Sequence, residues 1–195
     1  MLTIAPCLVS YACVKFDGYF YSKILNYIVI VTMILPIVGA YPSMIQVLNT
    51  LGLFDTILGI WLQKFNFLGI YFLTFSAAYK GIPKEFSEAA YIDGASEWQT
   101  LLSIILPLVR NMFFTVFLIH FVEMWNDYQV SLLYTPSYPT LARGVYEISR
   151  KTAGELATVP VRMMACMILV IPILVLFIAF HNRLMGNVSM GGVKE

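Results

Sequence analysis

The chain has 195 residues, of which 59% are hydrophobic and 12% are charged, and its formal net charge is +1. A soluble domain carries about 25% charged residues, so this composition excludes an ordinary soluble domain and places the chain in a lipid bilayer. The small net charge also excludes a nucleic-acid-binding surface, because no basic cluster is present to neutralise phosphates.

Five apolar stretches follow one another along the chain, at 2–14, 24–40, 57–78, 101–122 (with an extension towards 133) and 163–180. A transmembrane helix needs about 20 apolar residues, so the last four stretches are long enough and the first is too short. We therefore expect an all-α, polytopic transmembrane helical bundle, a single domain over 1–195 with about four full spans and a partial first one. The first stretch is interpreted as the second half of a span, so that the chain would be N-terminally incomplete; a signal peptide is the alternative.

The three cysteines, Cys7, Cys13 and Cys166, each lie inside an apolar stretch. This placement is typical of small packing residues. Their spacing indicates neither a disulfide framework nor a metal site, and no cofactor is expected.

The distribution of lysine and arginine predicts the orientation in the membrane. If the spans alternate, one side collects Lys15, Lys23, Lys80, Lys84, Arg110, Arg183 and Lys194. The positive-inside rule identifies this side as the cytoplasm. The loop 41–56 has no lysine or arginine, as expected of the opposite side, whereas the loop 134–160 carries three and weakens the pattern without reversing it. We expect the C-terminus and the loop 80–107 to be cytoplasmic.

The polar loop 80–107 predicts a short helix that projects from the membrane. Pro83 suits the first turn of a helix, and Gly94 supplies a natural stop. Ala89 and Ala90 would let another surface approach the helix backbone closely. From the residues alone the segment is either a helix that docks in a groove of a partner or a connector that lies on the membrane surface, and the connector is the simpler interpretation.

A second helix is predicted to re-enter the membrane directly afterwards. Ser96 and Gln99 have the spacing of a capping box, so the helix should begin at Glu97. Pro107 is expected to kink it after about three turns.

The spacing in this loop resembles the signature of permease subunits of bacterial ABC importers. The signature has Glu-Ala-Ala, three residues, Gly, nine residues and then Ile-x-Leu-Pro, and here its positions are filled by Glu88, Ala89, Ala90, Gly94, Ile104, Leu106 and Pro107. The segments GLFDTILG, IPKEFSEAAYIDGAS, MWNDYQ and GGVKE resemble the carbohydrate-importing branch, particularly its maltose-type second permease subunit. The resemblance covers essentially the whole chain.

The resemblance implies a permease subunit of an ATP-driven importer of sugars or oligosaccharides in the bacterial cell membrane. Its partners would be two cytoplasmic ATP-binding subunits, a second permease subunit and an extracellular solute-binding protein. The chain would not be an enzyme, because it has no G-x-x-x-x-G-K-[ST] loop and ATP hydrolysis would belong to the partner. The residues implied in coupling to the ATPase are Glu88, Ala89, Ala90, Asp93, Gly94 and Pro107. An importer of another small solute is the nearest alternative, and a membrane-embedded enzyme is a more distant one.

A polar stripe interrupts the fourth apolar stretch, formed by His120, Glu123, Asn126 and Asp127. Ionisable groups at membrane depth usually face a bundle interior or a water-filled path, so these residues are candidates for lining a translocation path. Alternatively, Asn126 and Asp127 lie in the outer membrane interface beside neighbouring aromatic residues. The sequence specifies neither the solute nor whether the pore is a homodimer or a heterodimer.

Overall fold

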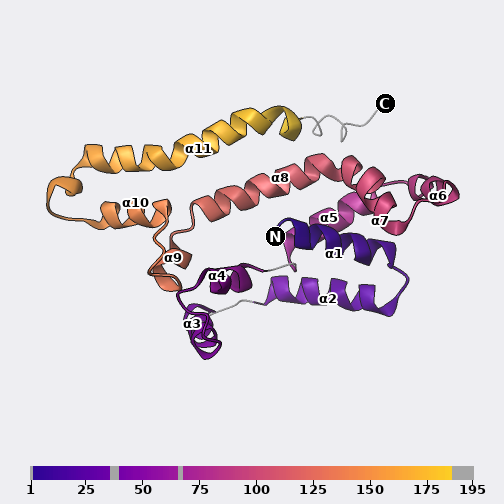
Figure 1. The fold of residues 1–195 in the computed structure, drawn as a ribbon, viewed down its shortest axis with the longest axis horizontal. Coiled ribbons are helices and arrows are strands. Elements are labelled where there is room, and N and C mark those ends of the chain that lie inside the picture. The colour runs from indigo at the N-terminus through magenta and orange to yellow at the C-terminus, as the bar shows by residue number, and fades with distance from the viewer. Residues whose placement is uncertain (1, 36–39, 66–67, 186–195) are drawn as a thin grey trace. The chain divides into compact units, whose positions relative to one another are not determined.

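The computed structural model describes residues 2–35, 40–65 and 68–185, with side chains as far as His181 (Figure 1). Helices are the regular elements of these residues, which confirms the all-α prediction. The elements in chain order are α1 (Ile4–Lys15), α2 (Phe20–Ile34), α3 (Ala40–Thr50), α4 (Ile57–Lys64), α5 (Ile70–Lys80), α6 (Glu85–Ile92), α7 (Glu97–Thr100), the π-helical turn η1 (Leu101–Ile105), α8 (Leu106–Trp125), α9 (Gln129–Leu133), α10 (Leu141–Arg150), the 3₁₀ turn η2 (Glu155–Ala157) and α11 (Val159–Met185).

The described residues fall into two compact units, one from 2–35, 68–117 and 183–185 and the other from 40–65 and 118–182. In the first unit, α1 packs against α5 and against α2. Its main buried cluster consists of Cys7, Phe75, Tyr79, Leu101, Ile105, Val109 and Val116. A second cluster consists of Cys13, Val29 and Phe72. The single domain over 1–195 stays a prediction.

The cysteines only partly follow their prediction. Cys7 and Cys13 are buried free thiols, as expected of packing residues, and the Cys7 Sγ lies 3.0 Å from the Tyr79 hydroxyl oxygen. Cys166 on α11 is exposed, so the packing interpretation is wrong for this residue.

The second unit has its own core and a tightly bonded loop. Leu48, Val130 and Tyr134 form the buried cluster. The Asp55 carboxylate accepts hydrogen bonds from the backbone N–H and the hydroxyl of Ser137, at 3.0 and 2.6 Å. These bonds fasten the α3–α4 loop to the loop that follows α9.

The stretch 57–78, expected as one span, is divided between two helices. Helix α4 ends at Lys64 and α5 begins at Ile70, while 66–67 lie outside the described residues. Gly69 precedes α5 with φ 138°, a backbone conformation that L side chains rarely adopt and that cannot continue an α-helix. Mean hydropathy could not reveal this break, because it averages composition and carries no information on backbone dihedrals.

Two helices of the described residues are long and apolar enough to cross a membrane, Glu97–Trp125 and Val159–His181. Only 22% and 6% of their most apolar windows are buried within the chain, whereas a core helix of a soluble protein is mostly buried. Their exposed apolar surfaces therefore suit a lipid environment. Helices α1 and α2 are apolar but shorter, and the predicted span 24–40 runs into 36–39, outside the described residues.

Candidate functional site

The loop predicted to dock a partner contains the short helix α6. The helix begins at Glu85, two residues after Pro83, and its first turn carries Glu85 and Glu88. Carboxylates are favourable here, because the first turn of a helix presents unpaired N–H groups and a partial positive charge. The short helix predicted from the sequence is present, but Pro83 lies before it and not in its first turn, so that part of the prediction is wrong. Its projection from the membrane stays a prediction.

A glycine corner ends α6. Gly94 has φ 78°, and its backbone N–H donates to the carbonyl oxygen of Tyr91 at 3.0 Å. The N–H of Ala95 donates to the carbonyl oxygen of Ala90 at 2.9 Å. These two bonds form a Schellman motif, which needs a left-handed residue at the position of Gly94. The predicted stop is confirmed.

The predicted capping box starts the next helix. The Ser96 hydroxyl accepts the backbone N–H of Gln99 at 3.4 Å, and the Gln99 side-chain oxygen accepts the backbone N–H of Ser96 at 2.7 Å. The helix begins at Glu97, as expected. The two ends of the corner, from Gly94 to Ser96, are thus fixed by local hydrogen bonds.

The irregularity expected at Pro107 takes the form of a π-helical turn. The turn covers Leu101–Ile105, and the N–H of Leu106 donates to the carbonyl oxygen of Leu101, five residues earlier. A proline has no N–H to donate and its ring clashes with the carbonyl four residues before it. The wider turn accommodates that clash while the helix continues to Trp125.

The predicted coupling residues differ in what the chain leaves exposed. Ala90 is only 4% exposed, so its small side chain packs within this chain. The exposed members of the set are Glu88, Ala89, Asp93, Gly94 and Pro107. Within the described residues the Glu88 carboxylate has no hydrogen-bond or ion-pair partner. Glu88 and Ala89 are therefore among the positions of α6 that remain open to another molecule, together with Glu85, Phe86 and Ile92.

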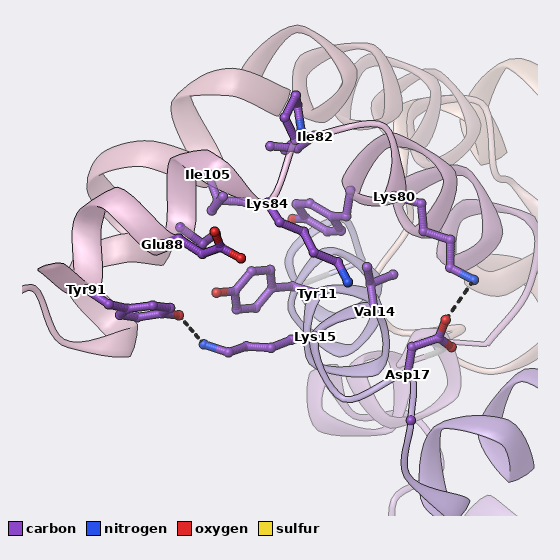
Figure 2. Close-up of a pocket in the computed structure, with 14 residues that line it drawn as sticks. Tyr11, Val14, Lys15, Asp17, Lys80, Ile82, Lys84, Glu88, Tyr91 and Ile105 are labelled. Atoms are coloured by element: carbon purple, nitrogen blue, oxygen red, sulfur yellow. Dashed lines mark hydrogen bonds and ion pairs between the residues drawn. The ribbon is translucent and has the colours of Figure 1, made fainter.

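A pocket of about 470 Å³ lies beside α6, between the ends of α1 and α5 (Figure 2). Three lysines line it, Lys15, Lys80 and Lys84, and Figure 2 shows Lys84 and Glu88 extending towards its centre. Lys80 forms an ion pair with Asp17 at 3.5 Å, whereas Lys84 has no partner among the described residues. The structure thus brings these three lysines to one pocket, and their position on the cytoplasmic side of the membrane stays a prediction.

A network of three side chains joins α1 to both sides of the glycine corner. The Lys15 ammonium donates to the Tyr91 hydroxyl and forms an ion pair with the Glu97 carboxylate. The Tyr91 hydroxyl donates to the same carboxylate at 2.9 Å. Sequence reasoning missed this network, because Lys15 and Tyr91 lie 76 positions apart and no local pattern relates them.

The second candidate set lies at the end of α8 and just beyond it, in the other unit. His120 is half-buried and Glu123 is exposed, and each interacts with other groups of the chain. The Asn126 side chain is exposed and donates to a carbonyl oxygen one turn earlier, at 2.9 Å. Nearby, the Trp125 indole N–H donates to a backbone carbonyl of α11 at 3.0 Å, and the Tyr128 ring stacks on a tyrosine of α10 with centroids 4.3 Å apart. Path lining by these polar residues stays a prediction.

Asp127 has two structural contacts. One carboxylate oxygen pairs with the Lys64 ammonium at 2.6 Å, and the other accepts the backbone N–H of Val130 at 3.1 Å. The paired side chains are only 29% and 18% exposed. Asp127 therefore ties the end of α4 to the start of α9.

Residues 12–185 match the profile of a family described as the binding-protein-dependent transport system inner membrane component. The chain belongs to this family. Membership agrees with the exposed apolar helices and identifies a multi-pass protein of the cell membrane.

Several curated permease proteins are similar to this family member. A probable ABC transporter permease protein of Pyrococcus horikoshii is 29% identical over 82% of this chain and 58% of its own length. The trehalose transport system permease protein of Mycobacterium tuberculosis is 26% identical over 98% of this chain and 70% of its own length. The lactose transport system permease protein of Rhizobium radiobacter is 27% identical over 86% and 60%. The chain thus spans between 58% and 70% of the length of these relatives.

Proposed function

We propose that this family member is a permease subunit of an ATP-driven importer of sugars or oligosaccharides, and that α6 is its docking helix. The observation that carries the proposal is the exposed, unpartnered surface of α6. The exposed Ala89 and the unpartnered Glu88 leave one part of the helix open, while Gly94 and the capping box at Ser96 fix how the chain leaves it. An exposed short helix with an unpaired carboxylate suits a polar groove on another subunit better than it suits the apolar interior of a bilayer.

The docked partner is a cytoplasmic ATP-binding subunit, one of two in the assembled transporter. The pocket lysines Lys15, Lys80 and Lys84 support a cytoplasmic position for α6 under the positive-inside rule. We propose the same side for the C-terminus, from the distribution of lysine and arginine in the sequence. When the two ATP-binding subunits close on ATP, they displace α6 and, through α5 and α7, the spans on either side. A second permease subunit completes the pore, and an external solute-binding protein delivers the solute. The words 'binding-protein-dependent' in the family description support the second of these partners.

A carbohydrate substrate is supported by the relatives. Two of them are described as transport proteins for trehalose and for lactose, and another, 32% identical over 58% of this chain, as a melibiose, raffinose and stachyose import permease of Bacillus subtilis. A second candidate is an osmoprotectant, because a Synechocystis relative, 26% identical over 95% of this chain, is described as an uptake permease for osmoprotective compounds.

The test is transport by the purified complex. The full-length protein is isolated from its own membrane with the subunits that co-purify, reconstituted in liposomes and supplied with binding protein. We expect an ATP-binding subunit in the complex and ATP-dependent uptake of at least one labelled disaccharide or trisaccharide. Uptake of an osmoprotectant that is not a carbohydrate, with no uptake of any sugar, contradicts the carbohydrate assignment. Solute flux that does not require ATP contradicts the importer itself.

A further inference from the structure

The side chains of Lys15, Tyr91 and Glu97 all contact one another, and their donors and acceptors match. An ammonium only donates, a carboxylate only accepts and a tyrosine hydroxyl does both. Here the Lys15 ammonium donates to the Tyr91 hydroxyl, a contact drawn in Figure 2, and forms an ion pair with the Glu97 carboxylate. The Tyr91 hydroxyl donates its own hydrogen bond to the same carboxylate. Each side chain therefore contacts both others, and a displacement of any one of them breaks two interactions.

The three residues of the network lie on three different helices. Lys15 is the last residue of α1, Tyr91 lies in the last turn of α6, and Glu97 is the first residue of α7. The carbonyl of Tyr91 also accepts the N–H of Gly94, so the same residue belongs to the corner through its backbone and to the network through its side chain. The local bonds of the corner determine how α6 meets α7, and the network is what connects this corner to α1.

The shielding of Lys15 distinguishes this network from an ordinary surface pair. Its side chain is 21% exposed, whereas the nearby pair of Lys80 and Asp17 is 54% and 55% exposed at a separation of 3.5 Å. Exposed pairs contribute little, because water and salt screen them, and shielding strengthens an interaction. The Glu97 side chain is 60% exposed, so water reaches the network at its carboxylate.

We propose that Lys15, Tyr91 and Glu97 are positioning residues that set the angle of the docking helix against α1. The proposal rests on the proposed function of α6. Backbone connections link α6 only to its neighbours in sequence, α5 and α7. The network adds a third attachment, to α1, so that a force on α6 reaches the helix that packs along α5.

The first experiment removes the charge at the centre of the network. Lys15→Met is compared with Lys84→Met, which removes a lysine from the same pocket but breaks no contact within the described residues. We expect Lys15→Met to lower the uptake per ATP hydrolysed by about fivefold, the effect of losing roughly 1 kcal/mol of interaction. Lys84→Met should keep the ratio of the unmodified protein, and exchanging the two charged residues, Lys15→Glu with Glu97→Lys, should restore most of it.

The outcomes separate the network from the proposed function. If the unmodified complex shows no ATP-dependent uptake, the proposed function fails. If it transports, and Lys15→Met and Lys84→Met give the same ratio, only the network is overturned. Tyr91→Phe removes a single hydroxyl and is the mildest variant; it must lower the ratio in the same direction, even where Lys15→Met assembles poorly.

The second experiment fixes the contact covalently. Lys15→Cys and Glu97→Cys are combined in a protein whose exposed Cys166 is replaced by serine, and the pair is linked with a short bismaleimide. A contact that sets a constant angle tolerates the link, so coupled uptake is expected to persist. Loss of uptake on linking, with uptake retained in both single-cysteine proteins treated alike, shows that the contact opens during the cycle and overturns the proposal.

Discussion

Gly94 offers the most direct test of the docking corner. An alanine in the left-handed conformation costs about 1–2 kcal/mol. The added Cβ would meet no other part of the chain within 4 Å, so this cost arises within the local backbone and not from packing against neighbours. The two hydrogen bonds of the Schellman motif contribute about 1 kcal/mol each to the stability of the corner. The conformational cost of Gly94→Ala therefore offsets most of this stabilising free energy. The population of the open corner should rise by about 5–30-fold.

The assay is the ratio of uptake to ATP hydrolysis at equal amounts of assembled complex. We expect a lower ratio for Gly94→Ala and a larger loss for Gly94→Val, because a β-branched side chain is more restricted. Gly94→Asn should resemble the unmodified protein, because asparagine tolerates the left-handed region. Gly144→Ala in α10 is the control, since its Cβ also meets nothing and its backbone is helical. Normal coupling in Gly94→Ala, or an equal loss in Gly94→Asn, refutes this reasoning.

Three further predictions concern the second unit. Gly59→Ala should destabilise the protein by about 1–3 kcal/mol, because the added Cβ would lie 2.3 Å from the backbone oxygen of Leu53. The measurement is thermal unfolding in detergent. An unfolding midpoint at or above that of the unmodified protein contradicts this close approach. Lys64→Met and Asp127→Asn should each lower the unfolding midpoint, because each breaks the ion pair. The stability lost in the double variant should be smaller than the sum of the two single losses. If the losses add strictly, the ion pair contributes nothing to stability. A cysteine in place of the half-buried His120 should react with a water-soluble thiol reagent in the assembled transporter. The labelling should exceed that of the native thiols alone. Lack of additional labelling in every nucleotide state would place this side chain in a packed interior.

The sequence by itself determined the features that depend on neighbouring residues. The capping box needs only Ser96 and Gln99 at the right spacing, and the corner needs only a residue that accepts positive φ at Gly94. The all-α membrane class follows similarly from composition and length of apolar stretches. Such features could be predicted because their energetics involve hydrogen bonds and dihedrals within one or two turns of chain.

The tertiary structure decided what depends on distant residues. Ala90 and Ala89 are equivalent in sequence, and only packing showed that the chain buries the first and leaves the second open. Asp127 and Lys64 lie 63 positions apart, and only the packing of their helices showed that the two charges form an ion pair. The contact of Lys15 with both sides of the glycine corner has no local signal, because ion pairs between separated helices depend on how those helices pack, and hydrophobic pattern does not specify which polar groups meet at their ends.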